Sequence, residues 1–140
     1  MFKFLLKIGV VGLLFGFAGC STNESNVPNV AVNLRLLVSN PDFINLNAVG
    51  GYVNLAGGSR GIIVYRYSVD EFRAFDRHCP FNSDQGCRVT VNSSAIEAED
   101  VDCCNSKFLI LDGSVIEGPA NQQLKPYTTS FNGNTLLIYN

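Results

Sequence analysis

Four cysteines lie within 26 residues of the chain, and this spacing constrains the fold more than any other feature. They are Cys79, Cys87, Cys103 and Cys104, and the single histidine, His78, directly precedes the first of them. Cysteines grouped in this way either bind metal ions or form disulfides, and the two outcomes give opposite functions. The chemistry of this cluster therefore decides most of what the protein can do.

The first 19 residues have the features of a secretory signal peptide. Two lysines precede an apolar run from Ile8 to Ala18, which is too short to span a bilayer comfortably. The segment Phe17-Ala18-Gly19-Cys20 resembles a bacterial lipobox, which implies that Cys20 becomes the first residue of the mature protein and carries lipid. A plain signal peptide or a short anchor helix is the alternative interpretation.

Residues 20–29 are predicted to form a polar tether, because the stretch 21–26 has too few apolar side chains to bury. Several acyl chains can hold such a chain on a membrane. Removal of residues 1–19 removes two lysines and no acid, so the net charge falls from −2 to −4. No basic patch indicates a nucleic-acid partner. We expect a protein anchored in the cell envelope, facing the periplasm or the exterior, with an unknown envelope protein as partner.

The remaining sequence consists of short β-type runs separated by turns. Residues 30–38 alternate apolar and polar side chains, as in a half-buried strand, and Asp112-Gly113 is a strong tight-turn signal. No stretch keeps a helical apolar period over three turns. The pattern predicts one all-β domain over 30–140, an antiparallel sandwich or small barrel. Its expected core includes four phenylalanines: Phe72, Phe75, Phe108 and Phe131.

Several of these runs resemble the Rieske [2Fe–2S] domain family. Residues 58–66, the hairpin segment 72–76 and Cys79-Pro80 resemble the approach to its first cluster-binding loop. Residues 106–108, followed by 112–120, resemble the second loop and its exit. The resemblance covers nearly all of 30–140 and implies a Rieske-like β fold with two cysteine-bearing loops.

The resemblance also implies where cluster ligands would stand. In the family each loop gives one cysteine and one histidine to the cluster. Cys79 matches the first cysteine, but Phe81 stands at the first histidine, Val101 at the second cysteine and Cys104 at the second histidine. Phenylalanine and valine have no lone pair to donate to iron, and Phe81 is expected to fill the vacated space.

Export to an oxidising compartment favours two disulfides over free thiols. The resemblance implies the pairs Cys87–Cys103, in the position of the family's own loop-to-loop bond, and Cys79–Cys104, where ligands would have been. No metal and no cofactor is favoured. The alternative is a [2Fe–2S] cluster with unusual ligands drawn from Cys79, Cys104, His78 and Cys103. A third interpretation is thiol redox chemistry or soft-metal binding at Cys103-Cys104, with Lys107 as cationic neighbour.

The remaining candidates receive simpler interpretations. His78 is predicted to lie on a surface loop, and the acidic residues 97–102 to form a solvated connector between the two cysteine loops. The sequence does not predict a histidine placed to activate a nucleophile, and no glycine loop cradles phosphate, so no catalytic residue is assigned. The sequence predicts a non-enzymatic structural or binding module, with an electron-transfer component of an oxidoreductase system as alternative.

Overall fold

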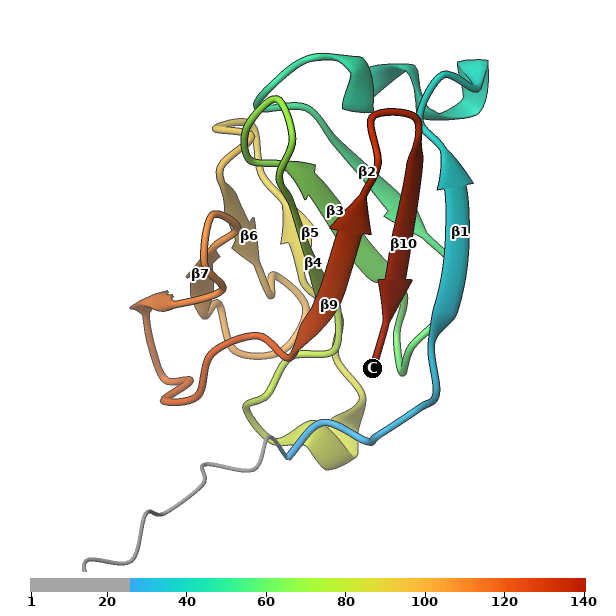
Figure 1. Ribbon diagram of the computed structural model, residues 1–140. Helices are drawn as coiled ribbons and strands as arrows, with labels where there is room; N and C mark the ends of the chain where they lie inside the picture. The colour runs from blue at the N-terminus through green and yellow to red at the C-terminus, as the bar shows by residue number, and fades with distance from the viewer. Residues whose placement is uncertain (1–25) are drawn as a thin grey trace, which may run out of the picture.

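A computed structural model describes residues 26–140, which form two antiparallel sheets (Figure 1). The larger sheet has the order β1-β10-β9-β4-β3-β2 and the smaller has the order β5-β6-β7-β8. The strands of the larger sheet are β1 (Asn33–Leu37), β2 (Tyr52–Leu55), β3 (Ile62–Arg66), β4 (Phe72–Asp76), β9 (Pro126–Phe131) and β10 (Thr135–Tyr139). Those of the smaller sheet are β5 (Thr90–Val91), β6 (Glu97–Glu99), β7 (Lys107–Leu109) and β8 (Val115–Glu117).

The prediction of an all-β antiparallel fold is confirmed. Every strand pairing within the described residues is antiparallel. The hairpins β3–β4, β7–β8 and β9–β10 lie where turn signals interrupt the apolar runs. Strand β6 was not predicted, because its sequence Glu-Ala-Glu contains a single apolar residue, too few to show the alternation that indicates a strand.

Strand β3 separates two hydrophobic cores because its side chains alternate between the faces of the sheet. Ile62 and Val64 pack into the core beneath β1 and β10, whereas Ile63 and Tyr65 pack into the core shared with the smaller sheet. All four are buried, so this strand has no solvent-facing side. Three of the predicted core phenylalanines, Phe72, Phe75 and Phe108, are buried, and Phe131 packs partly buried at the edge of the first core.

Two short 3-10 helices interrupt the strands. The first, η1 (Pro41–Asn47), begins at Asn40, whose side chain accepts a hydrogen bond from the amide of Asp42. The sequence indicated only a break here. The second, η2 (Ser83–Gln85), lies within the first cysteine loop. No helix among residues 26–140 is long and apolar enough to cross a membrane.

Candidate functional site

The candidate site lies where two loops meet at the end of the shared core. The first loop, residues 77–89, follows β4, and the second, residues 100–106, connects β6 with β7. Two backbone hydrogen bonds close the base of the first loop. The amide of Val89 donates to the carbonyl of Arg77, and the amide of Cys79 donates to the carbonyl of Cys87. Cys87 and Cys103 are joined by a disulfide, which ties the first loop to the second.

Cys79 and Cys104 are free thiols in this structure, with their sulfur atoms 3.8 Å apart. The Cys79 side chain is fully buried, and Cys104 is half-buried. Burial raises the pKa of the Cys79 thiol, and the neighbouring Asp100 raises it further. Cys79 is therefore held as a neutral thiol. The bond expected between these two cysteines is not formed here, and it remains a prediction.

Asp100 lies fully buried beside these sulfurs, so its placement in a solvated connector was wrong. Asp100 directly follows strand β6. Its amide donates to the carbonyl of Ser106, and its carbonyl accepts from the amide of Asn105. Its carboxylate accepts hydrogen bonds from the amide of Cys103 at 3.1 Å and the thiol of Cys104 at 3.2 Å. The two ion pairs within residues 26–140 join Arg73 with Glu71 and Lys107 with Glu117, and neither neutralises this carboxylate.

Ser106 completes the polar surroundings of Cys104. Its hydroxyl lies 3.0 Å from the Cys104 sulfur and accepts a hydrogen bond from the amide of Ala120 at 2.9 Å. This contact brings the Gly118-Pro119-Ala120 segment against the second loop. Lys107, the cationic neighbour expected from sequence, pairs instead with Glu117 at 2.9 Å.

His78 is buried, which contradicts the predicted surface position. Its Nε2 lies 2.8 Å from the carbonyl oxygen of Ser83, and because a carbonyl only accepts, Nε2 carries the proton. Its Nδ1 then accepts from the hydroxyl of Ser59 at 2.7 Å. Both ring nitrogens are thus hydrogen-bonded to groups other than the cysteine sulfurs. Through these bonds His78 attaches the first loop to Ser59, in the loop that precedes β3.

Asp76 was missed by the sequence analysis, although it organises the same region. The carboxylate is fully buried and accepts hydrogen bonds from the amides of Ser59, Arg60 and His78 and from the Tyr127 hydroxyl. Four donors compensate for removing this carboxylate from water. Gly58 leaves room for the network, because a Cβ there would lie 2.5 Å from both an Asp76 oxygen and the Tyr127 hydroxyl.

The residues at the site do not supply a Rieske ligand set of two cysteines and two histidines. Cys79, Asp100 and Cys104 place their ligand atoms within 4.8 Å of one another, but His78 is not part of the group. Phe81, at the position of the first histidine, packs against the core that contains Cys79. Val101, at the position of the second cysteine, is 60% exposed. Cys103, from the alternative ligand set, is bonded to Cys87.

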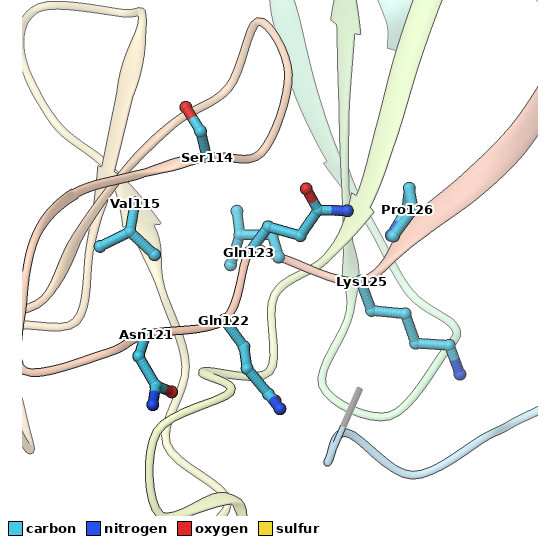
Figure 2. Close-up of a pocket in the computed structure, with 8 residues that line it drawn as sticks. Ser114, Val115, Asn121, Gln122, Gln123, Lys125 and Pro126 are labelled. Atoms are coloured by element: carbon cyan, nitrogen blue, oxygen red, sulfur yellow. The ribbon is translucent and has the colours of Figure 1, made fainter. Parts of the chain in front are cut away.

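A pocket of about 610 Å³, with both polar and apolar side chains in its lining, contains none of the cysteines (Figure 2). Its lining comes from the start of β8 and from the segment leading into β9: Ser114, Val115, Asn121, Gln122, Gln123, Leu124, Lys125 and Pro126. Lys125 points away from Val115 towards the N-terminal segment, where it donates to the carbonyl of Pro28 and to the Asn29 side chain. Residues 28 and 29, assigned to the tether, thus contact the domain. Cys20 lies outside the described residues.

Comparison with known proteins supports the fold. No family model and no curated protein matches the chain. It is similar to the cyanobacterial plasma membrane Rieske protein PetC3 from Synechocystis PCC 6803, with 24% identity and a TM-score of 0.54, over 68% of this chain and 91% of that chain. It is also similar to the ferredoxin of carbazole 1,9a-dioxygenase from Nocardioides aromaticivorans IC177, with 16% identity and a TM-score of 0.46, over 65% and 86%. The domain has a Rieske-like fold.

Proposed function

We propose that this protein is a bacterial lipoprotein of the cell envelope whose Rieske-like domain holds no [2Fe–2S] cluster and acts as a structural or binding module. The observation that carries the proposal is the chemistry of the ligand positions. Phe81 and Val101 offer no donor atom, and His78 uses both ring nitrogens in hydrogen bonds. What remains near Cys79 is one further thiol and one carboxylate.

The short distance in sequence between Cys20 and the domain supports membrane attachment, as does the lipobox-like segment. A lipid on Cys20 would be separated from Asn26 by a stretch that spans at most about 20 Å when fully extended. The amide of Asn26 donates to the side chain of Gln122, which lines the pocket described above. The face formed by 121–126 would therefore sit close to the membrane surface. The similar protein PetC3 is described as a plasma membrane protein, which is compatible with this arrangement.

Intact-mass analysis tests the anchor. We expect the exported protein to have the mass of the chain from Cys20 onward plus its acyl groups, because the sulfur and amine of that cysteine carry the lipid. Cys20→Ala should remove the added mass, whereas the neighbouring Ser21→Ala should keep it. A wild-type protein cleaved at Cys20 but carrying no acyl group would contradict the proposal.

The competing function is an electron-transfer protein that holds [2Fe–2S] with unusual ligands. The closeness of the Cys79, Cys104 and Asp100 ligand atoms favours it, because two thiols and a carboxylate can ligate iron. It predicts about two irons and two acid-labile sulfides per chain. We expect neither in protein from cells with active cluster assembly, and a well-behaved Rieske protein from the same cells controls for cluster supply.

A further inference from the structure

Cys79 and Cys104 differ in their access to solvent although their sulfurs are neighbours. The Cys79 sulfur is enclosed by the shared core, where Phe108 and Val89 are also fully buried. Cys104 belongs to the second loop and is half-buried. A disulfide has a sulfur–sulfur distance of about 2.05 Å, so an approach of about 2 Å would convert the observed 3.8 Å contact into a bond.

Asp100 supplies the carboxylate in contact with the half-buried thiol, whose sulfur also lies 3.0 Å from the Ser106 hydroxyl. Its Oδ2 lies 3.2 Å from the Cys104 sulfur, and its other oxygen is held by the amide of Cys103. A buried carboxylate without a cation is costly to maintain, so its position here calls for a chemical reason. Among the described residues, the titratable groups that lie against it are the free thiols of Cys79 and Cys104. The sulfurs of the Cys87–Cys103 bond also lie within 4.8 Å of it, but they carry no proton.

We propose that Cys79 and Cys104 form a reversible dithiol–disulfide centre that exchanges with an external disulfide. Cys104 is the attacking cysteine, Cys79 the resolving cysteine, and Asp100 the proton acceptor. The proposal rests on the proposed function, because a cluster ligated at this position would occupy both sulfurs. The co-reactant is a disulfide of a small molecule or of an exposed protein segment that can reach the second loop.

The reaction balances in two exchange steps. Asp100 takes the proton of Cys104, and the thiolate attacks one sulfur of the external disulfide, whose S–S bond breaks and whose first thiolate leaves with that proton. Cys79 then passes its proton through Asp100 to the second leaving thiolate, while its sulfur attacks Cys104 in the mixed disulfide. The two protein thiols are oxidised to one disulfide, and the external disulfide is reduced to two thiols.

The Cys87–Cys103 bond has a different role in this cycle. It joins the same two loops, so they stay together while the neighbouring pair is reduced. The raised pKa of Cys79 supports the order of attack, since a buried neutral thiol is a poor first nucleophile. Once Cys104 carries the mixed disulfide, the resolving sulfur is already in contact with it.

The first test follows all four cysteines in the full-length exported protein. The protein is equilibrated in reduced and oxidised glutathione at fixed ratios, free thiols are alkylated, and peptides are mapped by mass spectrometry. We expect residues 79 and 104 to become protected together in one two-electron transition and to appear as a 79–104 disulfide peptide. A different partner for either cysteine, or a 79–104 pair that stays alkylatable in the most oxidising buffer, would overturn the proposal.

The second test isolates the proton acceptor. Asp100→Asn should slow oxidation of the pair by glutathione disulfide at neutral pH by at least about tenfold, because positioned proton transfer contributes on that order or more. The matched control is Asp102→Asn, an exposed acid two residues away, which should leave the rate unchanged. Equal rates in the two variants would refute the role of Asp100.

Serine variants of the two cysteines test the order of attack independently, even if Asp100→Asn does not fold. Cys79→Ser should accumulate a glutathione adduct on Cys104, because no resolving thiol remains. Cys104→Ser should leave the buried Cys79 unmodified, and an adduct there instead would reverse the assigned order and contradict the proposal. Iron and sulfide in the purified wild-type protein would refute the proposed function itself, whereas metal-free protein with an inert pair would refute only this inference.

Discussion

The buried carboxylate of Asp76 links the first cysteine loop to the larger sheet. It receives hydrogen bonds from three backbone amides, those of Ser59, Arg60 and His78, and from the hydroxyl of Tyr127 on β9. His78 in turn binds Ser59 and Ser83 through its ring. The position of Cys79, one residue further along, therefore depends on a polar network rather than on hydrophobic packing alone.

We expect Asp76→Asn to lower the free energy of unfolding by about 3 kcal/mol, because one carboxylate oxygen becomes an amide group that faces buried donors. Urea denaturation measures the change. Asp84→Asn is the matched control, since Asp84 is exposed on η2, and it should change the stability by less than about 0.5 kcal/mol. Equal stabilities in the two variants would show that the network does not hold the loop.

Tyr127 makes a pH-dependent contribution through the same network. Burial raises the pKa of its hydroxyl, and the hydrogen bond to the Asp76 carboxylate raises it further. In the unfolded chain the hydroxyl ionises near pH 10, so the stabilisation is complete below that pH and is lost as the pH rises towards the higher folded pKa.

Tyr127→Phe should therefore lower the free energy of unfolding by about 2 kcal/mol at neutral pH, the typical contribution of a hydrogen bond to a charged group. The difference between the two proteins should shrink above pH 10, because only the wild type loses this contribution. Urea denaturation between pH 8 and 11 provides both curves. A constant difference across this range would contradict the assignment.

At the scale of single elements, the two cysteine loops are held by different devices. The first loop is closed by backbone hydrogen bonds at its base, where His78 and Arg88 form an isolated antiparallel β-bridge. The second loop is short and turns back on Asp100, whose carbonyl accepts from the amide of Asn105 at 2.7 Å. The disulfide between Cys87 and Cys103 then joins the loops across a sequence separation of 16 residues.

Replacing both Cys87 and Cys103 by serine should cost about 3 kcal/mol, the chain-entropy estimate for a loop of this length. The comparison is made in a background with serine at 79 and 104, so that only this one bond differs between the two proteins. Thermal or urea unfolding without reductant gives the value. Unchanged stability would mean that the bond does not constrain the unfolded chain.

Sequence patterns predict the elements of this domain better than they predict its site. The hairpins follow from apolar alternation on both sides of turn residues such as Asp112-Gly113 and Asn132-Gly133. The burial of Asp76 and His78 has no such local signal, since Asp76 binds Ser59 and Tyr127 and His78 binds Ser59, all distant in the sequence. Asp100 binds Cys103 and Cys104 in its own loop, but it stands in an acidic run that predicts exposure. The resemblance to Rieske loops located the right loops but not these partners.

At the scale of the whole molecule, a six-stranded and a four-stranded sheet share one core, and the cysteine loops close its end (Figure 1). The similarity to the solved Rieske protein PetC3 is a similarity of this framework. At the loops of this framework a phenylalanine packs on the core, a valine faces solvent, and two thiols lie in contact.

Electron paramagnetic resonance of the purified protein, recorded at low temperature after reduction with dithionite, tests whether the domain holds a [2Fe–2S] cluster. A reduced Rieske cluster is paramagnetic, whereas a pair of thiols and a disulfide are silent. A domain without a cluster gives no signal beyond that of the buffer, and this is the expected result. A Rieske-like signal that integrates to one spin per chain would contradict it.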